Sequence, residues 1–295
     1  MTQAPGTVSK ILWHFTGGPR WNTSKNRQEK RRKPEGEAYK ALLSILRTKE
    51  LKLGDYREVV RVRLPKLGPR NEKTGRFRIV KYEIANLQSS PVCCLSDIPI
   101  AHLSYQAKRY GRIAIGFHRD AVVRHGFNPV FYTLSHTRVL RSIYECLEEL
   151  VDVDSSADSI DWSASEIESE TATVECEHDH PVEVDIGSEV SSEVSNIQSS
   201  AGDIAVTVLS AQENLKKFLA FVKSFGANEF STIYCEREWR STQPFSFSEH
   251  DVAMIVLPKR NTGRSYFDDF TSRKARTLAL RRSIPVVPWE DLIEH

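Results

Sequence analysis

Two carboxylates placed two residues apart, Glu236 and Glu238, are the residues of this chain best suited to chemistry. On a β-strand, residues i and i+2 point to the same face and lie about 7 Å apart. We predict a strand over residues 229–238; in extended conformation through residue 240, both carboxylates would share a face with Tyr234 and Arg240. Two like charges at this separation are costly unless a cation lies between them. This face is therefore suited to polar chemistry.

Two other interpretations of the motif stay open. Alternating charges on an edge strand also discourage aggregation, with no further role. Arg240 can pair with either carboxylate and relieve the repulsion without any ligand. The motif alone does not decide between these roles, so evidence from the rest of the chain is needed.

Composition sets the broad class. The 295 residues suffice for one large domain or two small ones. No run approaches the roughly 18 apolar residues that a membrane-spanning helix needs, and the first ten residues lack the features of a signal peptide, so we expect a cytoplasmic protein. Five cysteines without paired C-x-x-C spacing indicate reduced, mostly buried thiols.

Charge is strongly segregated along the chain. The net charge is +2, but residues 142–215 contain nineteen acidic residues and neither Lys nor Arg. We therefore expect residues 146–204 to form a flexible, acidic, low-complexity insertion. It is either a plain solvated linker or a functional segment, which would act as a mimic of nucleic acid or as a cover for the protein's own basic surface. His178 and His180 have H-x-H spacing within this insertion, and we expect no metal site there.

Two segments concentrate the positive charge. Residues 20–33, expected to be a loop, contain seven Lys or Arg, and residues 57–81 are expected to form strands or an irregular basic excursion. Lys and Arg at this density bind nucleic-acid phosphates without sequence preference. Few aromatic residues interleave with them, so base stacking is not expected. The acidic insertion competes as a partner for this charge.

Apolar runs and their periodicity predict alternating short strands and helices. We expect a first strand at 11–16, a helix at 37–49, a buried strand at 92–99 and a helix at 101–110. Further strands are expected at 112–117, 128–132, 251–257 and 284–287, and further helices at 119–125, 211–225, 267–281 and 289–294. The mixture predicts an α+β fold of mixed, mostly antiparallel sheets with flanking helices, in one domain made of residues 1–145 and 205–295.

Four sequence blocks in order resemble the AbiGi family of abortive-infection proteins from bacterial phage defence. The blocks are W-H-F-T at 13–16 with L-x-x-I-L at 42–46, C-L-S-D-I-P at 94–99, H-L-S-Y-x(4)-Y-G-x-x-A-I-G-F at 102–117 with N-P-V-F-Y at 128–132, and E-R-E-W-R at 236–240. The family is labelled an antitoxin. The resemblance implies a cellular context of antiviral defence and a cognate toxin or antitoxin as partner.

The same blocks resemble ADP-ribosyltransferase-like domains, which include the DarT-type toxins. In that group a His on the first strand, an aromatic residue or Ser in the middle, and a Glu on a late strand gather around NAD. The resemblance implies NAD-binding roles for His14, Thr16, Ser96, Tyr105 and Tyr110, and catalytic roles for Glu238 and Glu236. The chain departs from the group's pattern because no Arg precedes Ser96 in a strict S-T-S, and because the spacing from Tyr105 to Tyr110 is shorter than in the diphtheria-toxin pattern. A retained fold without catalysis therefore stays open.

This resemblance implies a definite chemistry. Cleavage of the bond between nicotinamide and ribose passes through an oxocarbenium-like transition state, which a carboxylate on the ribose 2-hydroxyl stabilises. Glu238 would fill that role, His14 would position the ribose, and Tyr105 would stack on nicotinamide. Each residue also has a plain structural interpretation: a hydrogen-bonded His, a turn-forming Ser96 and packing tyrosines.

Three hypotheses follow. The first is a phage-defence protein that binds NAD and modifies a macromolecular target as an ADP-ribosyltransferase. The second is a non-enzymatic antitoxin or regulator that neutralises a partner toxin by direct binding. The third is a nucleic-acid-binding regulator that uses residues 20–33 and 57–81. The pyrophosphate of NAD is a competing partner for the positive charge of these two segments.

Overall fold

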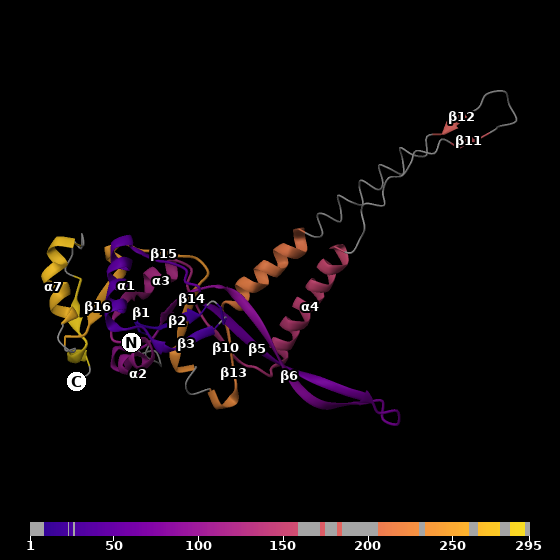
Figure 1. The fold of residues 1–295 in the computed structure, drawn as a ribbon, viewed down its shortest axis with the longest axis horizontal. Helices are drawn as coiled ribbons and strands as arrows, with labels where there is room; N and C mark the ends of the chain where they lie inside the picture. The colour runs from indigo at the N-terminus through magenta and orange to yellow at the C-terminus, as the bar shows by residue number, and fades with distance from the viewer. Residues whose placement is uncertain are drawn as a thin grey trace, which may run out of the picture. The chain divides into compact units, whose positions relative to one another are not determined.

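The fold was obtained as a computed structural model (Figure 1). It describes residues 9–22, 24–25, 27–158, 172–174, 182–184, 206–229, 234–259, 265–277 and 284–292. The chain divides into two units, residues 1–137 with 217–295 and residues 138–216, and each is described by itself. The protein is α+β with mostly antiparallel sheets, as predicted.

A seven-stranded sheet forms the centre of the first unit. Its strands, in spatial order, are β17 (Val286–Pro288), β16 (Val252–Leu257), β8 (Ala114–His118), β1 (Ile11–Phe15), β7 (Cys93–Ser96), β14 (Glu238–Ser241) and β9 (Asn128–Pro129). Neighbouring strands are antiparallel except β16 and β17, which are parallel. The N-terminal strand β1 thus lies in the middle, between segments from distant parts of the chain.

Helices cover both faces of this sheet. Successive residues of a strand point to opposite faces, so Leu12 and Trp13 belong to different hydrophobic clusters. Leu12 packs with apolar residues of α1 (Glu35–Thr48) and α7 (Tyr266–Thr277). Trp13 packs with α2 (Leu103–Tyr110). The result is a layer of helices on each side of one sheet.

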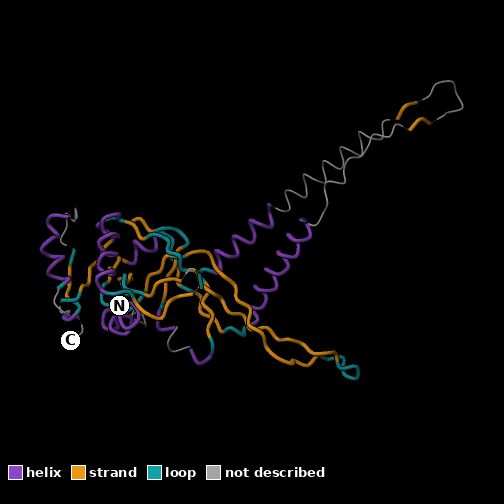
Figure 2. The backbone as a smooth tube through the Cα atoms, in the orientation of Figure 1, coloured by secondary structure: helices purple, strands orange, loops and turns teal. Residues whose placement is uncertain are grey.

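Smaller strand pairs surround the sheet, and helix α3 (Arg119–Arg124) follows β8. The pairs are β2 (Pro19–Asn22) with β3 (Arg27–Arg32), β5 (Arg57–Arg70) with β6 (Phe77–Pro91), β4 (Glu50–Leu51) with β15 (Phe245–Ser246), and β10 (Phe131–Leu134) with β13 (Val222–Phe225). The basic segment 20–33 is therefore a β-hairpin and not the predicted loop. The segment 57–81 follows the first of its two predicted alternatives, because it lies in the long β5–β6 ribbon (Figure 2).

The predicted helix at 211–225 extends too far. The helix ends at residue 219, and the last four residues of the predicted range form β13. All four are buried and pair in parallel with β10, so tertiary pairing overrides the local helical pattern here. This correction matters because β13 contributes a residue to the site.

The second unit contains α4 (Arg138–Asp158), the hairpin of β11 (Ala172–Val174) and β12 (Val182–Val184), and a helix that starts at residue 206. Helix α4 includes the first part of the acidic segment predicted to be flexible. Much of the rest of that segment, with His178 and His180, lies outside the described residues.

Two findings concern the whole described chain. None of its described helices combines the length and hydropathy that crossing a membrane requires. The expectation of mostly buried thiols is wrong for half of the described cysteines, because Cys93 is buried and Cys94 partly buried, whereas Cys146 and Cys235 are exposed.

Candidate functional site

Three adjacent strands carry three of the predicted site residues. His14 lies on β1, Ser96 ends β7, and Glu238 begins β14. Ser96 is the register partner of both Trp13 and Glu238. Because register partners point to the same side of a sheet, Ser96 and Glu238 share one side, whereas His14 points to the other side of its strand.

His14 lies where β1 and β7 begin to separate. The register of these two strands consists of the single pair Trp13 and Ser96. The His14 Nδ1 donates to the Cys94 carbonyl oxygen at 3.1 Å and so connects the strands beyond that pair. A carbonyl only accepts, so the proton is on Nδ1 and Nε2 is an acceptor. Burial lowers the pKa of His14, and Lys33 lowers it further, so the ring is neutral near pH 7.

A pocket of about 770 Å³ is lined by residues of β1, β7 and β14, among others. It is lined by six of the predicted site residues: His14, Thr16, Ser96, Tyr110, Glu236 and Glu238. Tyr105 does not line it, and 45% of the Tyr105 surface is exposed. The pocket volume falls within the usual range for small-molecule sites, roughly 300–1,000 Å³.

The two carboxylates reach the pocket in a different way from that predicted. Residues 230–233 lie outside the described chain, Tyr234–Glu236 forms a 3₁₀ turn, and β14 starts only at Glu238. Arg237 between them has a φ of 42°, in the left-handed region that non-glycine residues rarely adopt. The predicted strand over 229–238 is therefore wrong, and a strained turn brings the two acids together instead.

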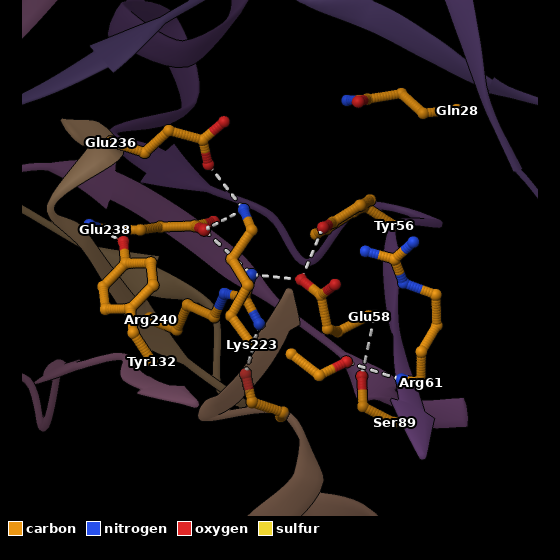
Figure 3. A network of polar contacts seen from close by, with 12 residues as sticks. Gln28, Tyr56, Glu58, Arg61, Ser89, Tyr132, Lys223, Glu236, Glu238 and Arg240 are labelled. Atoms are coloured by element: carbon orange, nitrogen blue, oxygen red, sulfur yellow. Dashed lines mark hydrogen bonds and ion pairs between the residues drawn. The ribbon is translucent and has the colours of Figure 1, made fainter. Parts of the chain in front are cut away.

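A cation that the sequence did not reveal lies between these acids. The Lys223 Nζ on β13 is 2.5 Å from Glu236 Oε2 and 3.0 Å from Glu238 Oε2 (Figure 3). All three residues are buried, with at most 8% of their surface exposed. Lys223 thus supplies the positive charge that two neighbouring carboxylates need.

Arg240 and Arg109 complete the neutralisation. The Arg240 side chain is fully buried; it donates to Glu238 Oε2 at 2.8 Å and also pairs with Glu58. Arg109 donates to Glu236 Oε1 at 2.6 Å. Three acids are thus matched by three cations in one network. The interpretation in which Arg240 pairs with Glu238 describes the geometry correctly.

These partners fix the protonation of the pocket wall. Burial opposes ionisation of Glu238, but Arg240 and Lys223 outweigh it and hold the pKa of the Glu238 carboxyl far below its usual range. For Lys223, burial is likewise outweighed by Glu238 and its neighbours, so the pKa of Lys223 is raised well above normal. Burial raises the pKa of Tyr110. Near neutral pH the wall presents a carboxylate, an ammonium group and an un-ionised phenol.

The rest of the lining adds aromatic rings and an uncompensated cation. Trp21 and Tyr56 pack edge to face with ring centroids 5.5 Å apart. The buried Trp21 Nε1 has no hydrogen-bond acceptor among the described residues. Lys33 also lines the pocket, and within the described part of the chain its ammonium group forms no ion pair. The lining therefore offers a ligand aromatic rings, a hydrogen-bond-accepting carboxylate and a positive charge.

Sequence reasoning missed Lys223, Arg109 and Tyr56. Arg109 is half-exposed on α2 and had no partner in the sequence that could be identified. For Lys223 a signal existed, because a single lysine within V-K-S-F between apolar residues is typical of a paired buried charge. The predicted helix over this segment concealed it.

Comparison with known protein families identifies the class of protein to which the chain belongs. A family model described as "Putative abortive phage resistance protein AbiGi, antitoxin" matches residues 69–290, which places the chain among the proteins of abortive phage resistance. The chain belongs to the AbiGi family. No curated protein and no solved structure matches it. The W-H-F-T block with His14 precedes the matched residues, and the resemblance to ADP-ribosyltransferases remains a prediction from the sequence.

Proposed function

We propose that this AbiGi-family protein acts in phage defence by binding NAD in the pocket between β1, β7 and β14 and transferring ADP-ribose to a macromolecular target. One observation carries the proposal. His14, Ser96 and Glu238 lie on three adjacent strands and line one pocket, in the order that the ADP-ribosyltransferase resemblance implies.

Each pocket residue would have a separate role in binding and catalysis. The ionised Glu238 accepts a hydrogen bond from a ribose hydroxyl, and this bond strengthens as positive charge develops on the ribose. The neutral His14 accepts through Nε2 and positions the sugar. Lys33 and Arg109 supply positive charge for the pyrophosphate, and Tyr110 supplies a ring for stacking.

NAD supplies the ADP-ribosyl group. The bond between nicotinamide nitrogen and ribose carbon breaks with its electron pair leaving on nicotinamide, and a nucleophile of the target forms the new bond and loses its proton. Lys223 contacts both carboxylates, so we assign it a positioning role: it holds Glu236 and Glu238 in one orientation.

The test measures binding and transfer separately. Calorimetry with NAD tests binding, and radiolabelled NAD with lysate of phage-infected cells tests transfer and hydrolysis. We expect Glu238→Gln to retain most of the affinity and to lose transfer about 100-fold or more. The matched control is Glu83→Gln, which removes an exposed acid that does not line the pocket. Absence of NAD binding, transfer and hydrolysis in the wild-type protein would overturn the proposal.

A second candidate function is neutralisation of a partner toxin by direct binding. The observation that favours it is the pairing of Glu238 Oε2 with both Lys223 and Arg240, which suits a structural acid as well as a reactive one. The antitoxin description of the family agrees with this function. Co-expression with the cognate toxin separates the two: protection by Glu238→Gln equal to that by the wild type supports direct binding, and loss of protection supports the enzyme.

A further inference from the structure

The outer ribbon, which we define as residues 63–84 of β5, β6 and the turn between them, exposes many apolar side chains. Five large ones have 44–55% of their surface accessible: Leu67, Phe77, Ile79, Tyr82 and Ile84. A two-stranded ribbon has no core of its own, and a row of exposed apolar residues on it marks a binding surface.

The strand register places these side chains together. The pairs Pro65 with Tyr82 and Leu67 with Ile79 lie on one face, because a bulge at Val80 shifts the alternation between them. Phe77 lies two residues before Ile79 on β6 and therefore belongs to the same face. We call this side of the outer ribbon the aromatic face. Arg63 also belongs to it, and its guanidinium carbon lies 3.9 Å from the centroid of the Tyr82 ring.

The opposite side is basic. Lys66 and Lys81 are register partners there, and both contact Glu83, at 3.3 Å and 2.9 Å. The outer ribbon as a whole contains seven basic residues, Arg63, Lys66, Arg70, Lys73, Arg76, Arg78 and Lys81, against Glu72 and Glu83. Its surplus of positive charge is exposed to solvent, where opposite charges on a ligand can reach it.

We propose that the outer ribbon binds single-stranded nucleic acid. Unpaired bases stack on exposed aromatic and Arg side chains, and phosphates attract Lys and Arg. Both requirements are met here on one short ribbon, with Phe77 and Tyr82 on the aromatic face. In a duplex the faces of the bases are stacked on one another, so the outer ribbon would bind a duplex through its positive charges alone. RNA and DNA share this chemistry, so the experiment distinguishes them.

This proposal differs from the expectation, based on the sequence, that the basic segments offer no surface for base stacking. The basic segment 57–81 contains Phe77 as its single Phe, Tyr or Trp residue, which argued against a stacking surface. The bulge at Val80 brings Tyr82 to the face of Phe77, and that change cannot be seen from the sequence spacing.

The test is fluorescence anisotropy with labelled oligo-U, oligo-dT and a duplex of equal length, about twelve nucleotides, over a range of salt concentrations. We expect tighter binding of the single strands than of the duplex, and weaker binding at higher salt. The relative affinities of oligo-U and oligo-dT identify the preferred nucleic acid.

Two variants separate stacking from charge. Phe77→Ala with Tyr82→Ala should weaken single-strand binding about tenfold or more and leave the salt dependence unchanged. Arg70→Ser with Arg76→Ser and Arg78→Ser should lower the slope of log affinity against log salt by about 2. Phe131→Ala, which truncates an exposed ring on β10, is the matched control and should change neither.

Three outcomes would overturn the proposal: no binding of any oligonucleotide at low salt, duplex binding as tight as single-strand binding, or unchanged binding by the Phe77 and Tyr82 variant. Self-association of the chain that the same variant abolishes, without nucleic-acid binding, would assign the aromatic face to a second copy instead. NAD binding is measured separately, so failure here leaves the proposed function untouched.

Discussion

The ion network around Lys223 and the outer ribbon use the same residue types in opposite ways. In the network, Lys223 and Arg240 are buried and each contacts two carboxylates. In the outer ribbon, positive charges outnumber negative ones and lie in solvent. Buried charges are costly to leave unpaired, whereas exposed charges contribute little to stability and remain available to ligands. Substitutions in the ion network should therefore mainly lower the free energy of unfolding, whereas substitutions in the outer ribbon should mainly weaken ligand binding.

The largest effect should come from Arg240→Met. The change keeps most of the side-chain volume but leaves Glu58 and Glu238 without their shared cation. Removal of one member of a buried ion pair typically costs about 3–5 kcal/mol of folding free energy. Urea unfolding followed by tryptophan fluorescence measures this cost.

The control for Arg240→Met is Arg237→Met, three residues earlier. The Arg237 side chain is 40% exposed and contacts Asp97 at 3.3 Å. Its loss should cost less than 1 kcal/mol, in the range of exposed ion pairs. Equal losses for the two variants would contradict the distinction between buried and exposed charges.

The next effect concerns the pH dependence that Glu238 gives to folding. Its pKa is lowered in the folded protein, whereas an unfolded Glu titrates near 4.3. As the pH falls below that value, the unfolded chain takes up the proton first, so the stabilisation is present above about pH 4.3 and is lost towards lower pH. Glu238→Gln should cost about 2 kcal/mol at neutral pH, and the difference from the wild type should shrink in acid.

Urea unfolding at a series of pH values tests this prediction. Glu83→Gln, an exposed acid with two lysine neighbours, is the control and should follow the wild-type profile closely. Parallel profiles for the wild type and Glu238→Gln would show that the carboxyl titrates normally in the folded protein.

A smaller effect is expected from Gly17→Ala, at the turn after β1. A β-carbon built on Gly17 would lie 2.7 Å from the Tyr110 carbonyl oxygen, which is closer than real contacts allow. The end of α2 would have to move, at a cost of about 1–2 kcal/mol. Because Tyr110 lines the pocket, ligand affinity should fall as well.

Thermal unfolding and NAD calorimetry follow both consequences of Gly17→Ala. Gly226→Ala is the control, because Gly226 does not line the pocket and its added β-carbon would meet its nearest atom at 3.5 Å, an ordinary contact. A normal melting temperature with normal affinity for Gly17→Ala would show that α2 adapts to the methyl group without disturbing the pocket.

The sequence predicted those elements that apolar runs define. Strands β1, β7, β8 and β16 and helices α1, α2, α3 and α7 lie close to their expected positions, because each buries a continuous run or one periodic face. The order of blocks also led to a common pocket for His14 and Glu238. A linear pattern can reveal such proximity when the strands concerned become neighbours in one sheet.

The partners within the network could not be predicted in the same way. Lys223 meets Glu236 and Glu238 because β13 pairs with β10, and this long-range pairing overrides a local helical pattern. Glu236 faces the pocket because of a left-handed residue at Arg237, whereas a regular strand was expected. Both features depend on tertiary contacts, which spacing in the sequence does not contain.

The smallest effect on stability should come from the outer ribbon. Phe77→Ala with Tyr82→Ala removes two rings that are 55% and 47% exposed, so little apolar burial is lost. We expect a change in folding free energy of about 0.5 kcal/mol or less, although the same variant should lose most of its affinity for single strands. Urea unfolding measures the first quantity and anisotropy the second. A loss of stability comparable to that of Arg240→Met would mean that these rings pack against the protein itself, and the contrast between a structural network and a ligand-binding ribbon would then be untenable.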